Sequence, residues 1–142
     1  MRMKSDTKKA LEILRREELT CAVCRGDEVY KSQRRGVAPL LNWLDNGMRF
    51  SGFCAADKVV GAGAAYLYVL LGVEELFATV VSDSARRVLQ QHGIALHYET
   101  LVPYIVNRAG DGTCPIESAV AEATDPVDAL TRIRRRLVEL KA

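Results

Sequence analysis

The pattern of hydrophobic and polar positions divides the chain into short apolar runs separated by amphipathic segments. An apolar run at 19–25 and an alternating stretch at 28–32 flank Gly26-Asp27, which predicts a β-hairpin with a two-residue turn. Further apolar runs predict three buried strands, at 50–56, 75–81 and 94–98. The pattern therefore indicates five strands in all.

Amphipathic spacing and capping residues predict helices around and between these strands. The predicted helices cover residues 5–18, 36–46, 57–71, 84–92, 114–123 and 125–140. After the hairpin, strands alternate with helices, which favours parallel strands joined by right-handed crossovers and covered on both faces. We therefore predict an α/β fold, a three-layer α/β/α sandwich with a mixed five-stranded sheet and an N-terminal antiparallel hairpin.

Length and charge narrow the picture to one domain without a nucleic-acid or membrane partner. The chain has 142 residues and a net charge of +2, which fits a single domain over 1–142. The excess charge lies in 123–142, so the rest is neutral and offers no broad basic surface for nucleic acid. The longest uncharged run, 59–73, would be about 22 Å long as a helix, shorter than a bilayer core of about 30 Å.

The four cysteines form no secreted disulfide framework, and the N-terminal segment is too charged for a signal peptide. Both features predict a cytoplasmic protein. Cys21 and Cys24 are three residues apart on a predicted strand, so we expect their side chains to point to opposite faces as core residues.

Asp57-Lys58 is the leading candidate site, because it lies where strand 50–56 passes into helix 57–71. Ligands of α/β sheets bind at such carboxyl ends of strands. In one interpretation Asp57 caps the helix and Lys58 is solvated. In the other, free amides and the helix dipole bind a phosphate that Lys58 also pairs with, or a desolvated Lys58 acts as nucleophile or base. The residues alone leave both interpretations open.

The glycines of GAGAA (61–65) do not form a dinucleotide-binding fingerprint, because Tyr66 stands where the last glycine should be. They fall inside the predicted helix 57–71, where they indicate close approach of that helix to the sheet or to another helix. Cys114 opens a second predicted helix, where a thiolate is stabilised, and Glu117 one turn later would be its acid–base partner.

Three further polar residues complete the candidate set. Arg35 and Arg108 each have the guanidinium group that clamps a phosphate with two hydrogen bonds. Asn107 precedes the glycine-rich loop 109–113, whose backbone amides would suit an anion. For each arginine taken alone, a surface position near a helix or strand end is the favoured interpretation, and the loop 109–113 is alternatively a connecting turn.

Four stretches resemble a small uncharacterised prokaryotic family that carries a domain-of-unknown-function label and is assigned to the cytidine-deaminase-like fold. They are RRGVAPLL (34–41), ADKVVGAGAA (56–65), LVPYIVNR (101–108) and DGTCPIESAV (111–120). The resemblance implies a deaminase-like core over 8–122, with the amphipathic basic helix 124–142 outside it. It implies a fold but no activity.

The zinc motifs of deaminases can be compared with this sequence directly. Those motifs read H-x-E and P-C-x-x-C, and a catalytic zinc needs three protein ligands. At the corresponding turns this chain has Asp57-Lys58-Val59 and Cys114-Pro115-Ile116-Glu117, which lack the histidine and the second thiolate. We therefore predict no metal site, no cofactor and no hydrolytic deamination.

Two functions remain. The first is a zinc-free deaminase-like domain that binds a nucleotide or other phosphorylated small molecule, with Lys58 or Cys114 as nucleophile if a reaction occurs. It requires the turns at 57 and 114 to be neighbours around an open hollow. The residues assigned to this site are Arg35, Asp57, Lys58, Asn107, Arg108, Cys114 and Glu117. The alternative is a non-catalytic oligomeric or regulatory scaffold whose tail helix covers the body or a second subunit.

Overall fold

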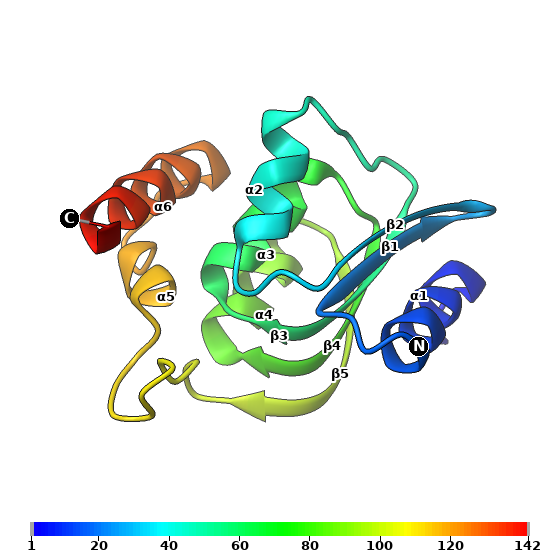
Figure 1. The fold of residues 1–142 in the computed structure, drawn as a ribbon, viewed down its shortest axis with the longest axis horizontal. Coiled ribbons are helices and arrows are strands. Elements are labelled where there is room, and N and C mark those ends of the chain that lie inside the picture. The colour runs from blue at the N-terminus through cyan, green and yellow to red at the C-terminus, as the bar shows by residue number, and fades with distance from the viewer. Residues whose placement is uncertain (1, 142) are drawn as a thin grey trace.

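The computed structural model describes residues 2–141 and contains one five-stranded sheet of order β2-β1-β3-β4-β5 (Figure 1). The hairpin strands pair antiparallel, as do β1 and β3, whereas β3, β4 and β5 are parallel. The predicted mixed sheet with an N-terminal hairpin is therefore confirmed. The strands are β1 (Cys21–Arg25), β2 (Glu28–Ser32), β3 (Cys54–Val60), β4 (Glu75–Ser82) and β5 (Ala95–Val102).

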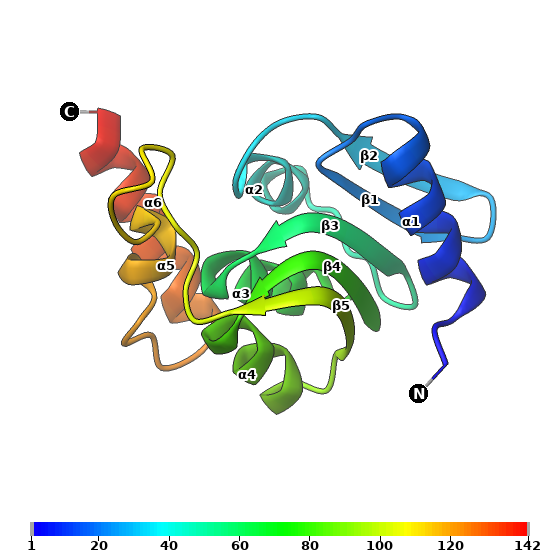
Figure 2. The same cartoon turned by 90° about the horizontal axis from the view of Figure 1, so that it is seen from below.

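Helices form a layer on each face of this sheet. Helix α1 covers one face, and α2, α3 and α4 cover the other, so that α1 and α4 lie on opposite sides of the strands (Figure 2). Helices α5 and α6 pack against α3, at the end of the molecule away from α1. The helices are α1 (Ser5–Arg16), α2 (Ala38–Asp45), α3 (Ala62–Leu71), α4 (Asp83–Gln91), α5 (Pro115–Ala119) and α6 (Pro126–Lys141).

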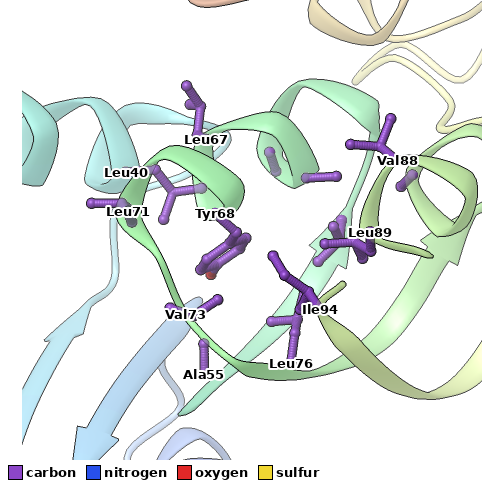
Figure 3. Close-up of a cluster of buried hydrophobic side chains, with 14 of the residues drawn as sticks. Leu40, Ala55, Leu67, Tyr68, Leu71, Val73, Leu76, Val88, Leu89 and Ile94 are labelled. Atoms are coloured by element: carbon purple, nitrogen blue, oxygen red, sulfur yellow. The ribbon is translucent and has the colours of Figure 1, made fainter. Parts of the chain in front are cut away.

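The larger core lies between the sheet and helices α2, α3 and α4. Tyr68 of α3 stands near its centre, fully buried among side chains such as Leu71 and Leu76 (Figure 3). A smaller core lies under α1 and includes Cys24. The Cys21 thiol instead lies beside the Tyr68 hydroxyl on the other face, as the alternation of strand residues predicted.

The tail helix α6 packs on the domain itself. Its Ala129 and Ile133 are completely buried, and Ile133 reaches α3 beside Gly63. Of the two coverings expected for the tail, the body or a second subunit, the structure shows the body. Within residues 2–141, no helix combines the length and the apolar character needed to cross a membrane.

The predicted boundary at Asp57 is wrong, because β3 continues to Val60 and α3 begins at Ala62 with Gly61 as its N-cap. The strand continues because Asp57 is buried in register with Ala78 of β4, and the β-branched Val59 and Val60 favour extended backbone.

Gly61 and Gly63 consequently lie at the start of α3 rather than a turn inside it. A Cβ atom on Gly63 would come within 2.6 Å of the Ile116 side chain of α5. The interpretation that the glycines permit close helix approach is therefore confirmed. Other boundaries also differ: β3 begins at Cys54 rather than at 50, β5 extends to Val102, and the helix predicted over 114–123 shortens to α5.

Candidate functional site

The N-termini of α3 and α4 meet at the carboxyl end of the sheet. Strands β3 and β4 are parallel neighbours, and each passes into a helix on the same face. Helix α4 is capped by Ser82, whose hydroxyl accepts a hydrogen bond from the Ala85 N–H at 3.1 Å. The N-cap of helix α3 is Gly61, which has no side chain to accept a hydrogen bond, so the first amides of this helix need another acceptor.

The carboxylate of Glu117 supplies that acceptor. Its Oε2 accepts hydrogen bonds from the Ala62 N–H at 2.9 Å and from the hydroxyls of Ser82 at 2.5 Å and Ser84 at 3.3 Å. Its Oε1 accepts the Ile105 N–H at 2.7 Å. All four donors are neutral, and Glu117 is only 7% exposed. The junction is therefore occupied by an acidic side chain of the chain itself.

Side chains fill the space around this carboxylate. A Cβ atom on Gly61 would lie 2.9 Å from Glu117 Oε2 and 3.1 Å from Ile105 Cγ1. Only glycine therefore fits at the start of α3 while Glu117 keeps its position. The junction is packed where an open hollow was required for a phosphate.

Asp57 lies inside β3 and points into the larger core. The Tyr68 hydroxyl donates to its Oδ2 at 2.6 Å, and the Val59 N–H donates to its Oδ1 at 3.3 Å. Burial raises the pKa of Asp57 to about 7, because these hydrogen bonds only partly offset the loss of hydration. Burial likewise raises the pKa of the neighbouring Cys21 thiol. Asp57 is thus a core carboxyl group rather than a helix cap.

Lys58 lies on the opposite face of β3 from Asp57. It is exposed and lines an open cleft of about 600 Å³ on the α1 side of the sheet. The structure therefore separates Lys58 from Asp57 and from the α3–α4 junction, although the two residues are adjacent in sequence.

The expected pair of Cys114 and Glu117 is not formed. Cys114 is the N-cap of the five-residue helix α5, and its N–H donates to the Ile105 carbonyl at 2.8 Å. Glu117 forms its hydrogen bonds with α3, α4 and Ile105 instead. Both residues form a hydrogen bond with the backbone of Ile105, but only the Glu117 side chain occupies the junction.

The remaining candidates lie on the surface or organise a loop. Arg35 is exposed between β2 and α2, and Arg108 is exposed in the connection from β5 to α5. The Asn107 side chain donates to Asp111 at 2.9 Å and accepts the Asp111 N–H at 3.2 Å. Asn107 therefore holds the glycine-rich loop closed. Across the described residues, no three His, Cys, Asp or Glu side chains gather closely enough to hold a metal ion.

Sequence reasoning missed the serines of the junction. Ser82 and Ser84 follow directly on a predicted strand, at the carboxyl end where ligands of α/β sheets bind. The segment V-S-D-S was therefore a usable signal. The predicted site at positions 57 and 114 does not include it.

Comparison with solved structures shows that the fold is shared with a known protein. The crystal structure of a DUF1893 family protein (TM1506) from Thermotoga maritima matches with a TM-score of 0.84 and 24% sequence identity. The match covers 97% of this chain and 92% of the other. Comparison with curated proteins gave no match. The family described as TM1506, domain of unknown function (DUF1893), matches residues 9–137, and the chain therefore belongs to this family.

Proposed function

We propose that this protein is a non-catalytic regulatory or scaffold domain with a cytidine-deaminase-like fold, in which an internal carboxylate seals the former ligand position. The observation that carries the proposal is the set of four hydrogen bonds to Glu117 at the α3–α4 junction. A phosphate would need the same donors. It would also displace Glu117, and a buried charged group without partners costs more than about 1–3 kcal/mol.

The residue types at the start of α3 support the same proposal. Its first residues are Gly61, Ala62 and Gly63, which offer neither the histidine nor the glutamate of the deaminase zinc motif. The α4 end contributes the hydroxyls of Ser82 and Ser84, which are not zinc-binding thiolates. These groups suit the internal carboxylate that they hold.

A ligand titration tests the sealed junction. Amide NMR spectra of the full chain would be followed during addition of inorganic phosphate, nucleotides and nucleotide sugars at millimolar concentration. The proposal predicts unchanged Ala62, Ser82 and Ser84 signals in the wild type. In Glu117→Ala, acetate or phosphate should perturb these signals, because the vacated donors accept an external anion.

The matched control for this titration is Glu122→Ala, because Glu122 is an exposed glutamate in the turn that follows α5. It should behave like the wild type. Perturbation of the three junction signals by a nucleotide in the wild type would contradict the proposal. The oligomeric state is measured by light scattering of the intact chain. A deletion of 124–142 is not a suitable test of oligomerisation, because it exposes the side of α3 that Ile133 buries.

The second candidate function is binding of a nucleotide or other phosphorylated small molecule at the same junction, with Glu117 displaced. The convergence of backbone and hydroxyl donors favours it, because this arrangement suits an anion at paired helix N-termini. The titration above separates the two candidates, since only this one predicts perturbation of the wild-type junction.

A further inference from the structure

A cleft of about 600 Å³ opens on the α1 face of the sheet, away from the Glu117 junction. This volume is within the range of small-molecule sites, roughly 300–1,000 Å³. The apolar part of its lining comes from Leu14, Val59 and Val80. The polar part comes from Arg15, Glu18, Lys58, Thr79 and Glu99.

Three of the polar residues form one row across three parallel strands. Asp57, Ala78 and Tyr98 are in register on one side of this row, and Val59, Val80 and Thr100 are in register on the other. Lys58, Thr79 and Glu99 therefore lie side by side on β3, β4 and β5. The row lies in the carboxyl-terminal half of the strands, the end at which α/β sheets bind ligands.

Strands β3 and β4 are both irregular at this row. Asp57 and Val60 contact the larger core although they are three residues apart, and so do Ala78 and Val81. In a regular strand, residues three apart point to opposite faces. Two consecutive side chains of each strand, Lys58-Val59 and Thr79-Val80, therefore line the cleft, while the pairing register of the strands stays constant.

The rim of the cleft contains a strained residue. Glu18 follows α1 with a φ of 54°, a left-handed conformation that favours glycine. The turn is closed by the Leu19 N–H, which donates to the Leu14 carbonyl at 3.0 Å. Glycine is the usual residue at this helix end, so the sequence keeps a carboxylate where it is conformationally unfavourable. Strain of this kind clusters at binding sites.

The charges of the cleft indicate what it would bind. Arg15 and Glu99 form an ion pair, whereas Lys58 and Glu18 have no charged partner within residues 2–141. A phosphorylated ligand would approach two carboxylates, and a simple cation would approach two basic groups. A molecule with one anionic and one cationic group avoids both repulsions.

We propose that this cleft binds a small zwitterion of the α-amino acid class. Lys58 pairs with the ligand carboxylate, Glu18 pairs with the ammonium group, and the Thr79 hydroxyl offers a further hydrogen bond. The apolar residues of the lining take the ligand side chain. The site is on the opposite face from Glu117, so it stands independently of the sealed junction and would serve a regulatory domain as its effector site.

An NMR titration of the full chain with each of the common amino acids tests this proposal. At least one amino acid should shift the amide signals of Lys58, Thr79 and Glu99. Lys58→Met and Glu18→Gln should each weaken its binding about tenfold or more, because each removes one charge contact. The N-acetyl and carboxamide forms of that amino acid should bind the wild type about tenfold or more weakly than the amino acid itself, since each form lacks one charge.

Matched controls are Lys141→Met and Glu122→Gln, because both residues are exposed and neither lines the cleft. They should change affinity by less than about twofold. The proposal fails if no amino acid perturbs the row, if the blocked forms bind equally well, or if phosphate or nucleotides bind there more tightly. Shifts of the Ala62 and Ser82 amide signals alone would contradict the proposed function, that of the sealed junction. Because the Lys58, Thr79 and Glu99 signals would then be unchanged, the cleft proposal would fail as well.

Discussion

The Ser82 hydroxyl donates to Glu117 Oε2 at 2.5 Å while it accepts the Ala85 N–H at 3.1 Å. One side chain thus caps α4 and anchors a carboxylate from α5. The Ala62 N–H of α3 donates to the same oxygen at 2.9 Å. Glu117 therefore joins three helices at one buried point, and its removal should be felt throughout this end of the domain.

Glu117→Ala should lower the free energy of unfolding by about 2–4 kcal/mol, because it leaves several buried donors without an acceptor. Glu117→Gln should lower it by about 1–3 kcal/mol, since an amide nitrogen cannot accept these hydrogen bonds. Urea denaturation measures both changes. The exposed control Glu122→Ala should stay within about 0.5 kcal/mol of the wild type. Equal stability of Glu117→Ala and the control would show that the junction does not need its carboxylate.

Asp57 should make stability depend on pH. Its pKa is about 7 in the folded protein and near 3.8 when unfolded, so between these values the folded state holds a proton that the unfolded state has lost. Stability therefore falls as pH rises through this window and levels off above about 7. Asp57→Asn removes this dependence while keeping an oxygen to accept the Tyr68 hydroxyl.

Urea denaturation of the wild type and Asp57→Asn at pH 5 and pH 8 tests this sign. The free energy of unfolding of the variant, relative to that of the wild type, should be about 2–3 kcal/mol higher at pH 8 than at pH 5. Other titrating groups are common to both proteins and cancel in the difference. A difference in stability that is the same at both pH values would mean that Asp57 titrates normally.

The hairpin and the parallel strands that follow it were predictable because their signals are local. Gly26 occupies the two-residue turn with a φ of 58°, and alternation along β1 separates Cys21 from Cys24. The boundary at Asp57 was not predictable in this way. A charged pair normally marks the end of a strand, and Asp57 is accommodated in one because the Tyr68 hydroxyl, on the next helix, reaches its carboxyl group.

The role of Glu117 depends on contacts that no local pattern encodes. Its donors come from Ala62, Ser82, Ser84 and Ile105, and Ala62 lies 55 residues away in sequence. The sequence does show glycines at 61 and 63, but their purpose follows only when α5 is placed against α3. The chemistry of each residue could be stated beforehand, whereas the partner of each could not.

Gly63→Ala should destabilise the domain by about 1–3 kcal/mol, although alanine is the better helix former. The reason is the 2.6 Å separation that its Cβ would have from Ile116 Cγ2. A double-mutant cycle with Ile116→Ala tests this reason, because truncating Ile116 removes the clash. The alanine at 63 should then cost less than in the wild-type background by about 1 kcal/mol or more. Strict additivity would place the cause elsewhere.

Glu18→Gly should stabilise the protein by about 0.5–1 kcal/mol, because glycine adopts a φ of 54° without steric cost. The matched control is Glu12→Gly in the interior of α1, which should destabilise by about 1 kcal/mol since no positive φ is relieved there. Thermal unfolding of the three proteins measures both changes. If Glu18→Gly gains stability and loses amino-acid binding, the strain and the carboxylate serve the same cleft. If it loses stability, Glu18 is held by packing, and strain no longer supports a binding role for this residue.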